Sequence, residues 1–198
     1  MKEKKKIFLS FRPEFFRPIL YNIKKYEYRK RFCDEPTTAY LYLSSPIKKV
    51  VGIMELEKAL HMDEIISNYS KESKVYGRII KCLEGGEKFD IPIESFQLFK
   101  NPISIEKIKQ IKNDFSVPQC YLNLQNYKSV LDYLESQPRF DIEFYNQHDM
   151  IYEDNLAMIC REMELTDEFI LKDKKYLSDK KYDIVECSYI NRKNGKNK

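Results

Sequence analysis

Hydrophobic and polar positions alternate in several stretches of the chain, with the period of two that is typical of half-buried β-strands. The pattern is clearest over 25–32, where Tyr26 and Tyr28 point to one face and Glu27 and Arg29 point to the other. In chain order, the strands predicted from such runs cover 7–11, 25–32, 39–43, 50–56, 89–99 and 117–124. The first part of the sequence therefore predicts a substantial β-sheet.

Apolar residues at a helical spacing replace this alternation elsewhere. The predicted helices cover 14–21, 62–83 with a break at 70–73, a short piece after Ser104, 127–135 and 152–164. Pro13 suits the start of the first helix, because proline is tolerated in a first helical turn. Gly52 lies inside a predicted strand and indicates a bulge or a close approach of two backbones. This order of elements predicts an α+β domain on a mixed or mainly antiparallel sheet that curls into a small barrel.

The composition is that of a folded protein. The chain has 198 residues, of which 42% are hydrophobic and 33% charged, so it is long enough to bury a core. It contains no long apolar run and no secretion signal, which predicts a soluble, cytoplasmic protein without a membrane partner. The five cysteines form no CxxC pair, and neither His61 nor His148 lies at a metal-ligand spacing. We therefore expect no metal site and no cofactor.

The sign of the charge changes along the chain. Residues 1–125 carry 23 Lys and Arg against 16 Asp and Glu, whereas residues 126–190 carry 8 against 15, so the two parts have net charges of +7 and −7. Residues 191–198 add +4 and are expected to form a basic, disordered tail. We place a domain boundary near residue 125, followed by an acidic, mostly helical extension over 126–190. The basic first part suggests an anionic partner such as RNA, although an ordinary solvated basic surface would look the same.

Several stretches of the sequence and one motif resemble a known protein family. The stretches IFLSFRPEFFRPIL, NIKKYEYRKR and AYLYLSSPIKKVVGIMEL, in this order, resemble the ASCH domain, whose fold is a small β-barrel similar to the RNA-binding PUA domain. Lys24, Glu27 and Arg29 match three positions of the family motif GxKxxExR, and Asn22 stands in place of its glycine. Asparagine tolerates a positive φ better than other non-glycine residues, so the turn at the end of the helix can survive this change. The resemblance extends over about residues 5–125.

The motif residues form the predicted site. Glu27 and Arg29 share a strand face and Lys24 lies in the turn before it, so we expect the three side chains to converge at the mouth of the barrel. An arginine fork, a lysine charge and a carboxylate together suit RNA or a nucleotide-like ligand. Further candidate ligand contacts are Arg31, Arg12, Ser44 and Ser45. The alternative is a purely structural role, in which ion pairs among these residues connect the strand to the end of the helix.

Aromatic side chains in the predicted strands allow two interpretations. They could stack on bases, or they could pack in the core as strand alternation suggests. The residues concerned are Tyr26, Tyr28, Tyr40 and Tyr42. Alternation favours packing for at least two of them.

The resemblance also implies possible activities. Some similar proteins hydrolyse N4-acetylcytidine with the motif lysine, a threonine and a glutamate. Lys24 matches the lysine, but Glu27 occupies the threonine position, so Glu27 would have to activate water instead. Glu72 is a candidate second carboxylate, although its place favours a simple helix-start acid. Other members are associated with RNA cleavage, in which the motif cations would stabilise a phosphorane and Glu27 would act as base.

Three hypotheses follow from the sequence. The first is an RNA-binding or nucleotide-binding ASCH domain. The second is an enzyme acting on a modified nucleoside or on RNA, with Lys24 and Glu27 as its catalytic pair. The third is an interaction adaptor, in which the acidic region 126–190 folds over the basic face and regulates access to it.

Overall fold

The computed structural model describes residues 4–148 and 156–183. The strands are β1 (Lys5–Phe11), β2 (Tyr26–Arg29), β3 (Thr37–Leu43), β4 (Lys49–Leu56), β5 (Leu60–His61), β6 (Phe89–Ser104), β7 (Tyr121–Asn123) and β8 (Arg139–Tyr145). The α-helices are α1 (Phe16–Leu20), α2 (Met62–Ile65), α3 (Lys74–Gly85), α4 (Ile105–Ile111), α5 (Lys128–Glu135), α6 (Cys160–Met163) and α7 (Asp167–Leu177). Short 3₁₀ turns cover Pro13–Phe15, Ile66–Asn68, Leu124–Asn126 and Lys180–Tyr182. The predicted tail at 191–198 lies outside the described residues.

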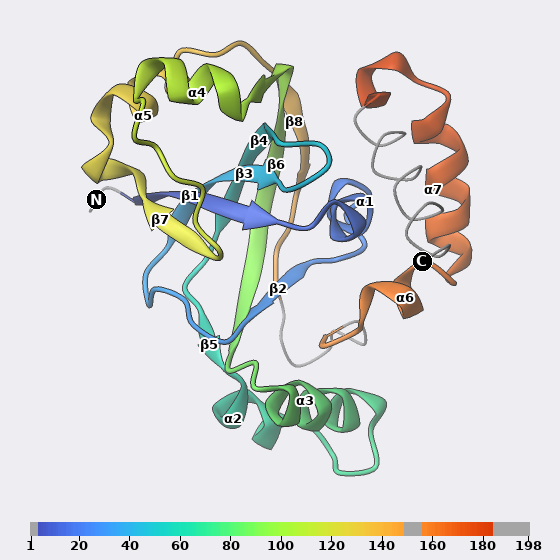
Figure 1. Ribbon diagram of the computed structural model, residues 1–198. Coiled ribbons are helices and arrows are strands. Elements are labelled where there is room, and N and C mark those ends of the chain that lie inside the picture. The colour runs from blue at the N-terminus through green and yellow to red at the C-terminus, as the bar shows by residue number, and fades with distance from the viewer. Residues whose placement is uncertain (1–3, 149–155, 184–198) are drawn as a thin grey trace.

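A mixed sheet forms the centre of the molecule (Figure 1). Its strand order is β2-β6-β4-β3-β1-β7, and β5 and β8 also pair with β6. β1 and β3 are parallel, whereas all other pairs are antiparallel. β6 is 16 residues long and serves as the spine, because four other strands pair with it. The sheet curls into a half-barrel with helices around it, so the predicted α+β class is confirmed.

The strand β8 was not predicted. It pairs with β6 from Ser95 to Phe99 and therefore extends the sheet into the acidic region, where the sequence pattern suggested helices. The helix α7 lies within the extension that was predicted to be mostly helical, although its bounds were not predicted. Of the helix predicted over 152–164, the described residues contain only α6. α5 matches the predicted helix at 127–135. The domain boundary near residue 125 stays a prediction.

Buried apolar residues cover both faces of the sheet. In β1, Ile7, Leu9 and Phe11 join one cluster with α1, while Phe8 joins a second cluster beneath α4 and α5. A third cluster lies between β2, α2 and α3. Alternate side chains of one strand thus enter different clusters, which is why β1 has both faces buried.

Three of the four strand tyrosines are core residues. Tyr26, Tyr40 and Tyr42 are buried, and Tyr42 packs its ring 5.2 Å from that of Phe8. Burial raises the pKa of Tyr40 to about 12. The packing interpretation is therefore confirmed for these three, whereas Tyr28 is only partly buried.

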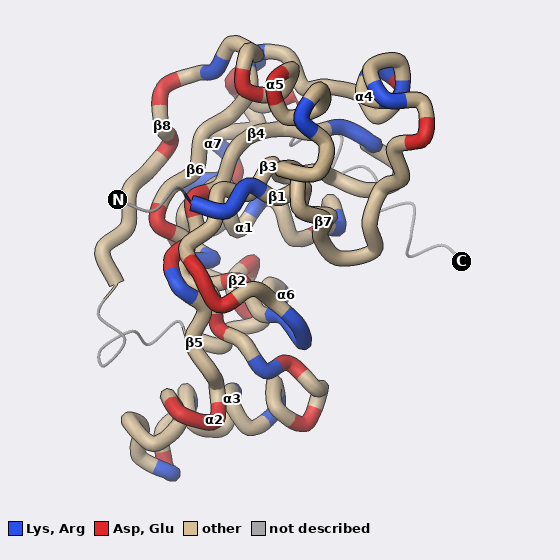
Figure 2. Tube along the Cα trace, turned by 90° about the vertical axis from the view of Figure 1, so that its left-hand side faces the viewer, with Lys and Arg blue, Asp and Glu red and all other residues tan. Residues whose placement is uncertain are grey.

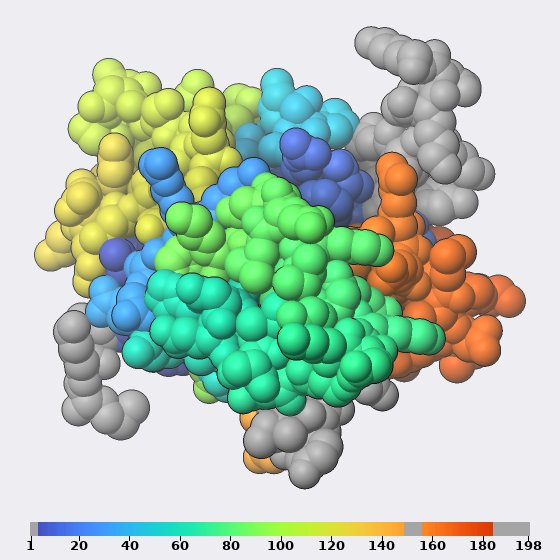
Figure 3. All heavy atoms as spheres, turned by 90° about the horizontal axis from the view of Figure 1, so that it is seen from below, coloured from blue at the N-terminus to red at the C-terminus, as the bar shows by residue number. Residues whose placement is uncertain are grey.

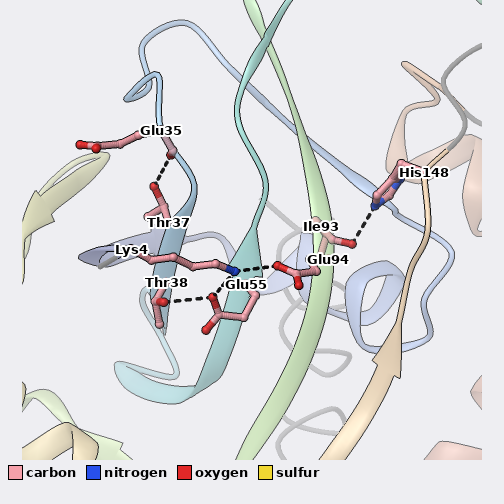
Figure 4. A network of polar contacts seen from close by, with 8 residues as sticks. All are labelled: Lys4, Glu35, Thr37, Thr38, Glu55, Ile93, Glu94 and His148. Carbon is pink, nitrogen blue, oxygen red and sulfur yellow. Dashed lines mark hydrogen bonds and ion pairs between the residues drawn. The ribbon is translucent and has the colours of Figure 1, made fainter. Parts of the chain in front are cut away.

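The lysine-rich start of the chain is neutralised by carboxylates from other elements (Figure 4). Lys4 Nζ lies 3.0 Å from Glu55 and 2.7 Å from Glu94, and Thr38 also donates a hydrogen bond to Glu55. The ion pairs Lys5–Glu35 and Lys6–Glu135 follow the same pattern. Basic and acidic positions are accordingly interspersed around β1 in Figure 2. The net charge of residues 1–125 is thus not a measure of a free basic surface.

Gly52 lies at the predicted irregularity. The pairing of β4 with β6 shifts register between Val50 and Gly52, and the pairing of β3 with β4 shifts between Leu41 and Tyr42. A Cβ atom at Gly52 would lie 2.3 Å from the carbonyl oxygen of Gln97 on β6. The bulge and the close backbone approach predicted from the sequence are both confirmed.

We expect Gly52→Ala to lower the free energy of unfolding by at least about 2 kcal/mol, because the added methyl group meets backbone in a packed sheet. Gly77→Ala is the matched control, since a Cβ there meets nothing within 4 Å and α3 should gain about 0.5–1 kcal/mol. Urea denaturation of both variants measures the difference. Equal stability of the two variants would contradict the close approach.

Candidate functional site

The turn between α1 and β2 carries the first motif residue. Asn22 has a φ of 55°, so asparagine takes the left-handed conformation in which the family motif has glycine. The amides of Ile23 and Lys24 both donate to the carbonyl oxygen of Pro18, at 2.9 and 2.8 Å. This backbone arrangement ends the helix and directs Lys24 toward the face of β2 that carries Glu27.

The three motif side chains converge. Lys24 Nζ lies 3.4 Å from Glu27 Oε2, and Arg29 Nε lies 2.7 Å from Glu27 Oε1. The side chains of Lys24 and Glu27 are only 6% and 7% exposed, and that of Arg29 is 17% exposed. Two cations on one nearly buried carboxylate satisfy a charge that burial would otherwise penalise strongly. The ion pairs of the structural alternative are therefore present.

Further contacts hold Arg29 in place. Its Nη2 donates to the carbonyl oxygen of Ser10 on β1 at 3.2 Å, and its Nη1 lies 3.7 Å from Cys120 Sγ. Its guanidinium carbon is 5.5 Å from the ring centroid of Phe11. Lys24 Nζ, in turn, lies 4.2 Å from the ring centroid of Tyr28. Arg29 thus spans from the end of β2 to β1 and to the residue before β7.

A pocket of about 390 Å³ opens beside these residues. It is lined by Ser10, Phe11, Arg12, Phe15, Glu27, Tyr28, Arg29, Ser44, Val117, Pro118 and Gln119. Two arginines and one carboxylate give this lining a net positive charge. The sequence left open whether the motif residues form structural ion pairs or a ligand site. The structure shows the ion pairs, and Glu27 and Arg29 also line the pocket.

The remaining sequence candidates divide into two groups. Arg12 and Ser44 line the pocket, and the Arg12 side chain is 73% exposed beside Glu14. Arg31 and Ser45 are exposed residues that do not belong to the lining. Their part in ligand binding stays a prediction.

Glu72 lies away from the pocket, in the exposed segment before α3. Ser70 donates a hydrogen bond to its carboxylate and lowers the pKa of Glu72. His61 packs against Phe89 in the β5–β6 region, with ring centroids 4.8 Å apart, and His148 Nε2 lies 3.0 Å from the carbonyl oxygen of Ile93. All three residues are thus placed in local contacts rather than in the pocket lining.

Sequence reasoning missed most of the pocket wall. Phe11 and Phe15 flank Arg12 within the quoted FRPEFF stretch, and their rings meet edge to face at 6.2 Å. The opposite wall is the segment 117–119, which Ser10 fixes by donating its hydroxyl to the carbonyl oxygen of Pro118 at 2.7 Å. The sequence signal that could have indicated this wall is the spacing of Phe11 and Phe15 around Arg12.

The described residues contain neither a group of His, Cys, Asp and Glu side chains that could hold a metal ion nor a helix long and apolar enough to cross a membrane.

Comparison with known proteins identifies the domain. No model of a protein family matches the chain. A protein from Zymomonas mobilis subsp. mobilis described as "ASCH domain-containing ribonuclease" is 27% identical over 122 residues, which cover 59% of this chain and 82% of that protein. The crystal structure of ASCH from Zymomonas mobilis matches with a TM-score of 0.52 at 23% identity, over 68% of this chain and 97% of that one. A serine-to-alanine mutant of it gives a TM-score of 0.52 at 25% identity.

These matches define the class of the fold. The curled half-barrel with its flanking helices is an α+β fold of the PUA-like class. The relative and the solved structures support an ASCH domain in this chain, as its motif predicted. About a third of the chain lies outside the match to the solved structure, whereas that structure is matched almost completely.

We expect Asn22→Gly to leave the free energy of unfolding unchanged or higher, because glycine adopts the φ of 55° without strain and the buried Asn22 Oδ1 has no hydrogen-bond partner among the described residues. Asn22→Ala should lower it by about 1 kcal/mol, because alanine is strained in this conformation. Thermal denaturation compares the two variants. An alanine variant as stable as the glycine variant would contradict the strained turn.

Proposed function

We propose that the protein binds RNA or a nucleotide-like ligand, with one unstacked nucleotide in the pocket beside Glu27 and Arg29. The observation that carries this proposal is the pocket itself, which combines two arginines, one carboxylate and aromatic side chains. A volume of about 390 Å³ falls within the range of ordinary small-ligand pockets. Proteins that recognise single-stranded RNA use this combination of stacking surface and charge-assisted hydrogen bonds.

Each group in the pocket has a chemical role in this proposal. Phe15, half-buried beside the core residue Phe11, offers an apolar ring on which a base can stack. Arg29 is held by Glu27, Ser10 and Cys120, and a guanidinium has more N–H donors than these contacts use, so it can also donate to a phosphate or a base edge. Glu27 can accept a hydrogen bond from an exocyclic amine.

The relative named as a ribonuclease supports RNA as the class of ligand. The support is for the class only, because the two proteins share 27% identity. Arg12, largely exposed at the rim, adds a positive charge where a flanking phosphate would lie. Arg12 at the rim would then position the RNA through a phosphate, whereas Glu27 and Arg29 would select the base inside the pocket.

Titration of a short single-stranded RNA at fixed salt tests binding. We expect Arg12→Ala to weaken the affinity about fivefold or more, and the double variant Lys24→Ala with Arg29→Ala to weaken it at least about tenfold. Arg12→Ala carries little risk to folding, because its side chain is 73% exposed. Lys58→Ala removes the same charge from an exposed residue that does not line the pocket, and should change the affinity less than about twofold. Unchanged affinity in both pocket variants would contradict the proposal.

RNA cleavage is the second candidate function, favoured by the carboxylate of Glu27 between two cations and by the name of the relative. In this reaction the 2′-hydroxyl would attack the adjacent phosphorus as Glu27 accepts its proton, and Arg29 would stabilise the negative charge of the phosphorane. The P–O5′ bond would then break as protonated Glu27 returns the proton to the leaving oxygen. Hydrolysis of N4-acetylcytidine would instead require Glu27 to activate a water molecule. Both reactions place the same residue in the role of base.

If the protein is an enzyme, Glu27→Gln should lower the rate of RNA cleavage at saturating RNA at least about 100-fold, because the amide keeps the shape but cannot take a proton. Gel analysis of short RNAs incubated with both proteins measures this, and N4-acetylcytidine can be included as a second substrate. Turnover that is equal in the wild type and the variant would remove Glu27 as the base.

A further inference from the structure

The C-terminal segment 156–183 belongs to the core around the motif. Leu156 and Ala157 are buried in the cluster that contains Tyr26 of β2. Met163 and Phe169 are buried in the cluster that contains Tyr21 and Ile23, the neighbours of Asn22 in the turn. This segment, called the supporting segment below, therefore packs on both sides of the stretch that carries Lys24.

On one side, α7 holds the end of α1. Lys172 Nζ donates a hydrogen bond to the carbonyl oxygen of Tyr21 at 2.7 Å, and the Tyr21 hydroxyl donates to Asp173 at 2.7 Å. Asp173 also pairs with the buried Arg17, and the Phe169 ring lies 5.2 Å from that of Tyr21. Tyr21 directly precedes Asn22, so a cation takes one of the carbonyl groups that the end of the helix leaves without a partner.

On the other side, the supporting segment contacts β2. The amide of Ala157 donates to the hydroxyl of Tyr28 at 2.8 Å, and the Tyr28 ring lies beneath the ammonium of Lys24. Burial, together with the charge of Asp90, raises the pKa of Tyr28 well above its usual range, so this hydroxyl is a neutral acceptor at physiological pH. The ion pair of Arg78 on α3 with Glu162 at 3.2 Å fixes the segment between these contacts.

The supporting segment does not cover the pocket. None of the pocket-lining residues comes from 156–183, and of the hydrogen bonds described above only that of Ala157 to Tyr28 reaches a lining residue. Figure 1 shows α6 and α7 beside α1, and Figure 3 shows the segment beside α3. Its contacts therefore lie behind the motif, where they can hold it in place without blocking the entry of a ligand.

We infer that the supporting segment positions Lys24 and, through the ion pair of Lys24, the Glu27 carboxylate that lines the pocket. It does so by fixing the Asn22 turn through Lys172 and Asp173 and the Tyr28 ring through Ala157. Lys172 and Asp173 are positioning residues, since they act through the turn and do not line the pocket. The effect on affinity rests on the proposed RNA binding, whereas the effect on the turn does not. The adaptor hypothesis predicts the opposite effect on RNA affinity, because a segment that covers the basic face would weaken binding, whereas a supporting segment strengthens it.

Hydrogen exchange tests the turn without any ligand. The reporters are the amides of Ile23 and Lys24, which donate to Pro18. In the full chain, Lys172→Met should speed the exchange of both at least about fivefold, because it removes the hydrogen bond to Tyr21 but keeps most of the aliphatic stem. Lys174→Met, on an exposed position of the same helix, should leave both rates unchanged. Equal rates in the two variants would overturn the inference.

A double-mutant cycle tests the link to Lys24. Lys172→Met should weaken binding of a short single-stranded RNA about threefold to tenfold, and should cause no further loss in the Lys24→Ala background. An equal loss in both backgrounds would overturn the inference, because the segment would then act on binding in another way.

Two further results keep the two proposals apart. If Lys24→Ala leaves the affinity unchanged, the proposed role of Lys24 in RNA binding fails, and the exchange rates alone decide whether the segment positions the turn. If Lys172→Met does not fold, Phe169→Leu replaces it, since it removes the ring that packs 5.2 Å from that of Tyr21 and lies outside the pocket lining.

Discussion

The nearly buried carboxylate of Glu27 holds together the parts of the molecule on which the site depends. It pairs with Lys24 from the turn after α1 and with Arg29 from the end of its own strand. Removing either cation would leave a buried charge with fewer partners, which is far costlier than losing a surface ion pair. This constraint links the turn to β2 and orients the guanidinium.

Arg29 connects the Glu27 ion pair to the strands on the other side of the half-barrel. The described sheet order ends at β2 and β7, and Arg29 reaches from β2 to Ser10 on β1 and to Cys120 next to β7. The pocket lies at this side of the sheet, between the end of β1 and the segment 117–119. A residue that stabilises the fold therefore also faces the pocket, so structural ion pairing and ligand binding are not exclusive interpretations of the motif.

The sequence pattern predicted the features that depend on neighbouring residues, namely the strand β2 and the turn at Asn22. Alternation over 25–32 gave both the strand β2 and the face shared by Glu27 and Arg29, and asparagine at position 22 gave the turn with positive φ. The wall at 117–119 could not be predicted, because Ser10 and Pro118, which join it to β1, are 108 positions apart. β8 was missed although Phe140, Ile142 and Phe144 alternate, because pairing with β6 decides its structure and the acidic composition suggested a helical extension.

The most direct test is to map amide chemical shifts of the full chain by NMR during titration with a short single-stranded RNA. If the pocket is the binding site, the shifts that change with RNA should concentrate in the non-proline residues that line it, which are 10–12, 15, 27–29, 44, 117 and 119. Changes confined to the exposed lysines of α3 or α4, or none at saturating RNA, would contradict the central claim that a nucleotide enters the pocket beside Glu27 and Arg29.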